Sequence, residues 1–447
     1  MAKARRIFVC QSCGARHPKW LGRCPTCRQW DTLVEEPAEA TPGREPVSTP
    51  ELVPLAQAAE RDQPRLPSGI PELDRVLGGG LVGGMVVLVG GEPGIGKSTL
   101  MLQLAASLGK SGTKVLYLAA EESARQVGLR ARRLGAESEG VMLLAHTGLE
   151  AAAAAWREGE FSAVVVDSIQ AVRAAELSGA AGSVGQVRHC AAELAALAKE
   201  LGSALFLVGH VTKEGALAGP RVLEHLVDTV LYFESEPAMR RRILRAVKNR
   251  FGATDEVGVF EMTSRGLAAV DNPSAVFLAH RPRAAPGSAV CAALSGTRPL
   301  LVEVQALVSP SGLAMPRRQA LGVDPGRLHM LCAVLAIHAG RDLSAHDVFV
   351  NVAGGIRLAE PAADLAVAAA VASSLAGRPL PAEVVCFGEV GLAGELRAVS
   401  RASARLSEAR RQGFTRALTA PGKPLDPPGL TLLTARRLDE ALELLLD

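Results

Sequence analysis

Short apolar runs alternate with amphipathic, helix-like stretches between residue 68 and about residue 271. Most of these runs are continuously apolar, as strands are when helices cover both faces of a parallel sheet. The runs predict strands at residues 85–89, 115–119, 141–144, 163–166 and 204–208. We therefore expect an α/β core built on a parallel sheet.

The pattern changes after this core. Apolar runs at residues 227–233, 242–248 and 257–263 are separated by polar turns, which indicates a meander of consecutive strands. The last part of the chain opens with strand-like segments and closes with a helix-like segment at residues 436–446.

Composition divides the chain further. Residues 1–34 hold four of the eight cysteines, whereas residues 35–67 hold seven prolines, which is typical of a linker. We expect four parts: a cysteine module at 1–34, a flexible linker at 35–67, the core at 68–271 and another domain at 272–447. A chain of 447 residues has room for two or three domains.

Hydropathy and charge bear on the cellular location and on the kind of partner. No stretch of about 18 uninterrupted apolar residues occurs, and the chain opens without the apolar segment of a signal peptide. The net charge of +3 is too small to indicate a polyanionic partner by itself. We expect a cytoplasmic protein without membrane contact, whose cysteines stay reduced.

A glycine-rich motif follows the first predicted strand and precedes a predicted helix, which is the setting of a phosphate-binding loop. Glycines let backbone N–H groups close around phosphates, and the positive end of the new helix faces the anion. The predicted ATP-binding residues are Gly91, Glu92, Pro93, Gly94, Ile95, Gly96, Lys97, Ser98 and Thr99. Lys97 would neutralise the β- and γ-phosphates, and Ser98 would hold Mg²⁺.

Acidic residues follow two other predicted strands, at the edge where ligands collect in open α/β folds. Asp167 suits a role beside Mg²⁺, and Glu121 is our choice for polarising the attacking water, with Glu122 as the alternative. Both glutamates would lie next to the phosphate loop if their strand is adjacent to the loop's strand. His210 falls in a polar loop at the same edge, where a buried histidine satisfied by backbone is an equally good interpretation.

The N-terminal cysteines form two Cys-x-x-Cys pairs, namely Cys10 with Cys13 and Cys24 with Cys27. Four thiolates at this spacing predict a tetrahedral zinc site, which would staple a module that is too small to fold on its own core. A redox-active pair would need a thioredoxin-like setting that the sequence lacks. Two disulfides are disfavoured in a reducing compartment.

The cysteine module is also basic and partly aromatic. Two tryptophans, Trp20 and Trp30, lie among the cations Lys3, Arg5, Arg6, Lys19, Arg23 and Arg28. Such a surface could contact nucleic acid or a protein partner, or it could be a solvated face.

Residues 248–252 read Lys-Asn-Arg-Phe-Gly at the end of the predicted strand at 243–247. Together with the cysteine module and the segment at 66–80, this pentapeptide resembles the RadA (also called Sms) family of bacterial DNA repair proteins over essentially the whole chain. The resemblance implies a RecA-like P-loop ATPase that forms hexameric rings around single-stranded DNA. It also implies branch migration of branched recombination intermediates with the RecA recombinase, in the response to DNA damage and stress.

The resemblance carries roles to particular residues. The family's zinc ligands fall on the four N-terminal cysteines, its phosphate loop on residues 91–98 and its signature on Lys248, Asn249, Arg250, Phe251 and Gly252. Lys248 and Arg250 alternate along an extended run, so we expect both to point the same way. They could reach the γ-phosphate held by a neighbouring subunit or touch DNA phosphates, and a solvated basic strand end is the alternative.

The C-terminal part resembles the proteolytic domain of Lon, an α+β unit, over residues 353–372 and 388–397. Active Lon carries its nucleophile in a Pro-Ser-Ala-Gly run, whereas this chain has Ala362 there, and the activating lysine aligns near Ser403. A serine–lysine dyad cannot operate with neither member present, so we predict no peptidase activity. The domain is expected to be a scaffold for ring assembly.

These patterns predict a DNA-dependent ATPase motor of recombinational repair. The alternative is a nucleotide-gated DNA-binding protein that loads or stabilises recombinase filaments without translocating. Both functions need the same phosphate loop and the same basic contacts, so the sequence does not separate them.

Overall fold

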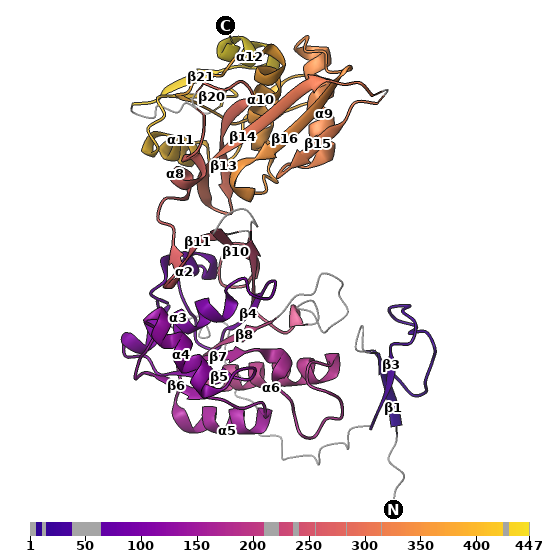
Figure 1. The fold of residues 1–447 in the computed structure, drawn as a ribbon, viewed down its shortest axis with the longest axis vertical. Helices are drawn as coiled ribbons and strands as arrows, with labels where there is room; N and C mark the ends of the chain where they lie inside the picture. Colours follow the sequence, from indigo (N-terminus) through magenta and orange to yellow (C-terminus); the bar gives the residue numbers. More distant parts are fainter. Residues whose placement is uncertain are drawn as a thin grey trace, which may run out of the picture. The chain divides into compact units, whose positions relative to one another are not determined.

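The computed structural model describes residues 6–10, 15–37, 64–209, 223–235, 241–254, 256–282, 284–313, 315–422 and 429–446. The chain divides into two units, residues Met1–Val270 and Asp271–Asp447 (Figure 1). Within the described ranges, no helix has both the length and the apolar character that crossing a bilayer requires.

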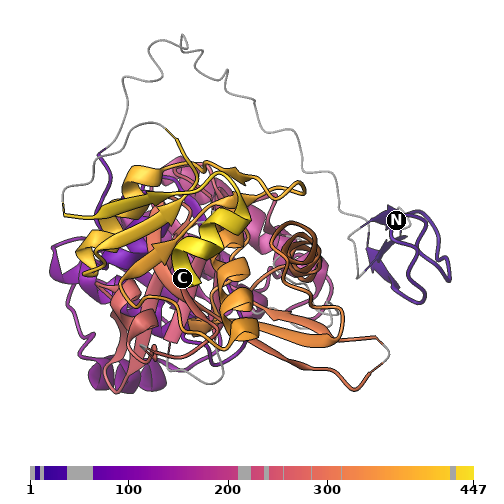
Figure 2. The same ribbon diagram turned by 90° about the horizontal axis from the view of Figure 1, so that it is seen from above.

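The N-terminal module is a small antiparallel sheet, drawn in indigo in Figure 2. Strands β1 (Arg6–Cys10), β2 (Arg16–His17) and β3 (Leu33–Pro37) pair in the order β2-β1-β3. Its core consists of buried Cys10, Cys24 and Leu33. A core this small is characteristic of modules that a metal ion holds together.

A mixed sheet forms the centre of the first unit. In the part of the chain that is described, its strand order is β12-β11-β10-β9-β4-β8-β7-β5-β6. The parallel strands are β4 (Val86–Gly90), β5 (Val115–Ala119), β6 (Val141–Leu144), β7 (Ala163–Asp167), β8 (Ala204–Val208) and β9 (Thr229–Ser235). The antiparallel meander continues through β10 (Arg241–Asn249), β11 (Val257–Thr263) and β12 (Gly266–Ala269). The predicted parallel core and meander are confirmed, and β9 joins them by pairing in parallel with β4.

Helices cover both faces of the parallel strands. Helices α2 (Pro71–Leu77), α3 (Lys97–Lys110) and α4 (Ala124–Leu134) contribute to one buried cluster, and α5 (Leu149–Gly159) and α6 (Val184–Leu201) contribute to another. Val87 belongs to the first cluster and its neighbour Leu88 to the second. Because successive strand residues face opposite ways, β4 is buried on both sides, which explains its continuous apolar sequence.

The second unit has a mixed sheet with helices. Among its described residues, the strand order is β15-β16-β14-β13-β17-β20-β21. These strands are β13 (Ser288–Ser295), β14 (Arg298–Pro310), β15 (Arg318–Leu321), β16 (His346–Val352), β17 (Val384–Cys386), β20 (Arg416–Thr419) and β21 (Thr431–Thr434). The helices are α8 (Pro273–Leu278), α9 (Pro325–His338), α10 (Asp364–Ala376), α11 (Ala402–Arg411) and α12 (Leu438–Leu446). Helix α10 is buried along most of its length, as its small apolar residues allow.

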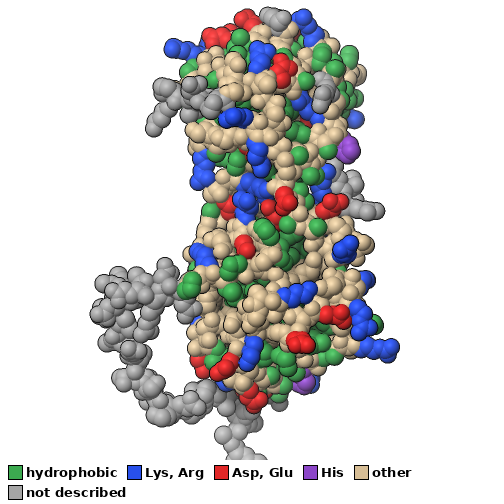
Figure 3. All heavy atoms as spheres, turned by 90° about the vertical axis from the view of Figure 1, so that its left-hand side faces the viewer, with side chains coloured by type: hydrophobic (Ala, Val, Ile, Leu, Met, Phe, Trp, Pro, Cys, Tyr) green, Lys and Arg blue, Asp and Glu red, His purple; other side chains and the backbone are tan. Residues whose placement is uncertain are grey.

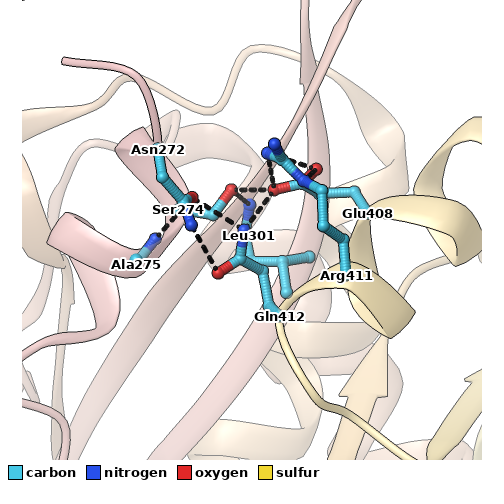
Figure 4. A network of polar contacts seen from close by, with 7 residues as sticks. All are labelled: Asn272, Ser274, Ala275, Leu301, Glu408, Arg411 and Gln412. Atoms are coloured by element: carbon cyan, nitrogen blue, oxygen red, sulfur yellow. Dashed lines mark hydrogen bonds and ion pairs between the residues drawn. The ribbon is translucent and has the colours of Figure 1, made fainter.

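A polar network joins the first helix of the second unit to the rest of that unit (Figure 4). Ser274 on α8 donates to Glu408 on α11 over 2.5 Å and accepts from the backbone N–H of Leu301 on β14 over 3.1 Å. Arg411 and Gln412 also donate to the Glu408 carboxylate, at 2.8 Å and 2.9 Å. Glu408 is buried, and these donors lower its pKa although burial alone raises it. The network therefore ties α8, β14 and α11 together through one charged group.

Candidate nucleotide and metal sites

The predicted phosphate loop connects β4 to α3, as expected. Gly91, Gly94 and Gly96 adopt φ values of 149°, 76° and 121°, which residues with a Cβ rarely adopt. Close packing also requires glycine at residue 96, because an added Cβ would lie 3.0 Å from Met262 Cε and 3.3 Å from Leu267 Cδ1. The loop is thus shaped both by its own sequence and by β11 and β12, which pack against it.

Lys97 is buried at the first turn of α3 and folds back onto the loop. Its Nζ donates to the carbonyl oxygens of Gly91 at 2.8 Å and Glu92 at 3.0 Å. Arg242, at the start of β10, donates from Nε to the loop carbonyl of Ile95 at 3.0 Å. Arg242 could not be recognised from the sequence, because this contact depends on a strand that lies about 150 residues away in the chain.

The two residues predicted to hold Mg²⁺, Ser98 and Asp167, contact each other beside the loop. The Ser98 hydroxyl donates to Asp167 Oδ1 at 3.1 Å, and the Tyr117 hydroxyl donates to Asp167 Oδ2 at 2.6 Å. Burial and the Asp167 carboxylate raise the pKa of Tyr117, so this phenol remains a hydrogen-bond donor. Oxygen ligands at the start of a phosphate-binding helix fit the ligand preference of Mg²⁺. Ser98 and Asp167 are therefore the residues that could hold the ion.

The two candidate glutamates have different surroundings. Glu122 forms an ion pair with Arg130 on α4, whereas Glu121 accepts from the Ser168 hydroxyl. Burial lowers the pKa of Lys97, and the charge of Glu121 is near enough to oppose part of that effect. This geometry favours Glu121 for orienting water. The condition of strand adjacency is not met, however, because β8 and β7 lie between β4 and β5. Glu121 comes near Lys97 because the C-terminal ends of all these parallel strands share one edge.

ATP binding is expected to weaken at high pH because of Lys97. Burial lowers the pKa of Lys97 to about 8, although the carboxylates of Asp167 and Glu121 act in the opposite direction. Bound triphosphate favours the charged amine, so binding takes up a proton above that pKa and affinity falls as pH rises. We expect the Kd of ATP, measured by calorimetry, to rise about tenfold between about pH 7 and pH 9. A Lys97→Arg variant keeps its charge and should not show this rise, so an equal rise in that variant would contradict the assignment.

The Lys-Asn-Arg-Phe-Gly signature lies at the opposite edge of the sheet. Strand β10 is antiparallel to β9, and β9 is parallel to β4, so β10 ends where β4 begins. Asp228 connects the end of β10 to the start of β4. Its carboxylate pairs with Arg250 at 3.0 Å and accepts from the backbone N–H of Val86 at 3.1 Å. The phosphate loop follows the other end of β4, about 16 Å away for a strand of this length. Within one chain, the signature therefore does not reach the loop.

The two signature cations contact the same segment of the chain. Lys248 Nζ donates to the carbonyl oxygens of Glu224 at 2.6 Å and Val227 at 2.7 Å, next to the Asp228 that binds Arg250. The reason differs from the predicted alternation, because the pairing of β10 shifts register between residues 246 and 248 and Arg250 lies beyond the strand. The Arg250 side chain is 60% exposed, so it is available to a neighbouring molecule.

The remaining signature residues build the turn. Asn249 donates to the carbonyl of Val76 at 3.1 Å and accepts from the backbone N–H of Phe251 at 2.9 Å. Gly252 packs backbone to backbone, because a Cβ there would lie 2.8 Å from the Cα of Gly78. These residues hold the turn against the C-terminal end of α2, and that contact fixes where the two cations lie.

Three of the four predicted zinc ligands come together. Cys10, Cys24 and Cys27 place their sulfur atoms within 4.8 Å of one another, and Cys13 lies outside the described residues. The Cys10 and Cys27 sulfurs are 3.6 Å apart, close to the roughly 3.8 Å expected for thiolates on one tetrahedral zinc ion. Although burial raises the pKa of Cys24, hydrogen bonds from the Cys27 backbone and from His17 lower it overall to about 7. The donor set and its geometry fit zinc.

Removing zinc is expected to unfold the N-terminal module and leave the ATPase core folded. A Cys24→Ser variant removes a buried ligand, so elemental analysis should find far less than the wild-type value of about one zinc per chain. A Cys190→Ala variant changes a cysteine buried in the core cluster and should keep its zinc. Full zinc occupancy in the Cys24→Ser variant would contradict this metal site.

The two positions that align with the catalytic residues of Lon carry no catalytic pair in this structure. Ala362 is buried and has no nucleophilic atom, and Ser403 lies on the exposed first turn of α11. Next to them, fully buried Arg405 holds Glu360 through two hydrogen bonds of 2.8 Å and 2.6 Å. This bidentate ion pair, in which the guanidinium is buried and the carboxylate half-buried, fixes the local structure. His210, the other candidate for a site residue, lies outside the described residues.

Three family models match separate parts of the chain. Residues 8–35 match the rubredoxin metal binding domain, residues 54–216 match an AAA domain, and residues 332–423 match subunit ChlI of Mg-chelatase. Among solved structures, a KaiC-like protein from the hyperthermophilic archaeon Pyrococcus horikoshii aligns with 46% of this chain and 99% of its own, at 20% identity and a TM-score of 0.39.

Curated relatives match the chain over its full length. A protein named DNA repair protein RadA from Pseudomonas aeruginosa is 52% identical and covers 100% of both chains. Proteins of the same name from Bacillus subtilis and Escherichia coli are 48% and 45% identical, each over 99% of both chains. With its RecA-like P-loop ATPase core, N-terminal zinc ribbon and Lon-like C-terminal domain, the chain belongs to the RadA family of DNA repair proteins.

Proposed function

We propose that this RadA family member is a DNA-dependent ATPase motor that assembles as a ring and hydrolyses ATP between neighbouring subunits. One observation supports this most strongly. The signature cations lie at the edge of the sheet opposite the phosphate loop of their own chain. A cation at this edge is too far from the phosphate loop of its own chain, so any nucleotide site that it completes belongs to another subunit.

The proposed division of labour follows from the contacts. Lys97 and the loop N–H groups hold the triphosphate in one subunit, and Glu121 orients the attacking water. Mg²⁺, held by Ser98 and Asp167, would neutralise charge on the phosphates. Arg250, with Lys248 beside it, reaches from the neighbouring subunit as an arginine finger. An interface that is complete only in the ring couples hydrolysis to assembly.

We further propose that the ring encloses single-stranded DNA and drives branch migration of recombination intermediates together with RecA. On the face drawn in Figure 3, Lys and Arg are mixed with Asp and Glu, so the charge of that face does not by itself mark a path for DNA. The full-length match to DNA repair proteins supports DNA as the partner. The Lon-like domain would hold subunits together and cleave no peptides, because Ala362 supplies no nucleophile.

The test is an ATPase assay with and without single-stranded DNA, followed by a branch-migration assay with RecA. The motor function predicts stimulation of ATP hydrolysis by DNA and ATP-dependent movement of the branch point. Stimulated hydrolysis without branch movement would favour the filament-loading alternative. No stimulation would contradict the motor function.

A further inference from the structure

The zinc ribbon presents two exposed tryptophans side by side. Trp20 is 55% exposed and Trp30 is 69% exposed, although large aromatic side chains usually lose most of their surface on folding. Both rings flank Gly22, because a Cβ added there would lie 3.6 Å from Trp20 and 3.7 Å from Trp30. Gly22 therefore lies between the two rings, within ordinary contact distance of both.

Local hydrogen bonds hold the aromatic surface in place. The Arg23 guanidinium lies 5.7 Å from the centre of the Trp30 ring, and its Nε donates to the carbonyl of Arg28 at 2.8 Å. The backbone of Asp31, next to Trp30, donates to the carbonyl of Gly22 at 2.8 Å. The rings thus stand on a turn that the zinc ligands Cys24 and Cys27 brace, and little order has to be gained on binding.

The charge around the rings favours an anionic partner. Residues 1–34 contain seven Lys or Arg residues and one acidic residue, Asp31. Three of these cations, Lys19, Arg23 and Arg28, are exposed in the same knuckle as the tryptophans. Even with a net charge of about −2 on a zinc ion bound by four thiolates, the module stays strongly positive. Aromatic faces among cations are the means by which proteins bind single strands, whose bases are free to stack.

We propose that Trp20, Trp30 and Arg23 form a stacking platform for the bases of single-stranded DNA, with Lys19 and Arg28 contacting its phosphates. This inference rests on the proposed function for the choice of DNA, and it adds a second contact outside the ATPase ring. Duplex DNA fits less well, because its bases are stacked on one another and hide their faces. The platform depends on zinc, because the small core of the module is built around the ligands Cys10 and Cys24.

The chain carries its own internal control for this proposal. It has three tryptophans, and the third, Trp156, is only 1% exposed in the ATPase core. Stacking of bases should therefore quench the fluorescence of Trp20 and Trp30 and leave that of Trp156 unchanged. In the full-length double variant Trp20→Ala/Trp30→Ala, the remaining emission comes from Trp156 alone.

The experiment combines two readouts on full-length protein. Anisotropy of a labelled oligo(dT) reports binding to any part of the protein, and tryptophan emission with unlabelled oligo(dT) reports contact with the ribbon. We expect quenching in the wild type that follows occupancy, no quenching in the double variant and an affinity loss of about tenfold for each ring removed. A Val34→Ala variant, which changes another exposed apolar residue of the module, should behave as wild type.

Each other outcome contradicts the proposal. Normal anisotropy without quenching in the wild type would remove the platform and leave the ring's DNA binding intact. Quenching that requires a second protein in place of the oligonucleotide would assign the surface to a protein partner. No anisotropy change at any concentration would contradict the proposed function as well.

Discussion

Replacing Lys97 by alanine is expected to lower the rate of ATP hydrolysis by at least about 100-fold. The Lys97 amine is the buried cation of the phosphate loop, where it holds the carbonyl oxygens of Gly91 and Glu92 in place of phosphate oxygens. Without it, the charge that builds up on the β- and γ-phosphates has no fixed partner in the subunit that binds them. Steady-state hydrolysis and ATP binding by calorimetry, measured on the same preparation, check this result.

Lys110 provides the matched control. It lies at the other end of α3, and its Nζ donates to the carbonyl of Gly135 at 2.8 Å on the protein surface. A Lys110→Ala variant therefore removes the same charge from the same helix without touching the loop, and it should hydrolyse ATP at nearly the wild-type rate. Equal activity of the Lys97→Ala and Lys110→Ala variants would contradict the phosphate-binding role of Lys97.

Replacing Arg250 by alanine is expected to lower kcat by about 1,000-fold and to change the affinity for ATP only slightly. The reason is geometric, since Arg250 lies beside Asp228 and the first residue of β4, away from its own phosphate loop. Its charge would stabilise the transition state in the neighbouring subunit, while ground-state binding depends mostly on the loop. Single-turnover hydrolysis and equilibrium ATP binding separate these two effects.

Arg245 is the control for this second variant, because it lies on the same strand and pairs with Glu234 at 3.3 Å. An Arg245→Ala change removes a positive charge from β10 without altering the signature, and it should leave kcat close to that of the wild type. A raised KM with unchanged kcat in the Arg250→Ala variant would mean that Arg250 helps to bind ATP and does not act as a finger.

Features encoded by neighbouring residues could be predicted from the sequence. The phosphate loop depends on glycines and on the strand and helix that flank it, and all of these lie within about 25 consecutive residues. The zinc site depends in the same way on the spacing of two cysteine pairs. Most strand positions also follow from local apolar runs. Burial on both faces makes β4 and its parallel neighbours continuously apolar in sequence.

Features that depend on distant pairing could not be predicted. Local sequence patterns do not give the strand order, so whether β4 and β5 are neighbours could not be predicted, and two strands lie between them. Arg242 looks like one of three consecutive surface arginines until β10 brings it to the carbonyl of Ile95. The register shift before Lys248 likewise breaks the simple alternation on which its orientation was predicted.

Mixing two inactive variants would test directly whether neighbouring subunits share the ATP site. The Lys97→Ala chain keeps its finger, and the Arg250→Ala chain keeps its loop. In randomly mixed rings of equal parts, about a quarter of the interfaces therefore pair an intact loop with an intact finger. Shared sites predict that the mixture hydrolyses ATP at up to about a quarter of the wild-type rate, far above either variant alone. A mixture that forms joint rings and stays as inactive as its components would contradict shared sites.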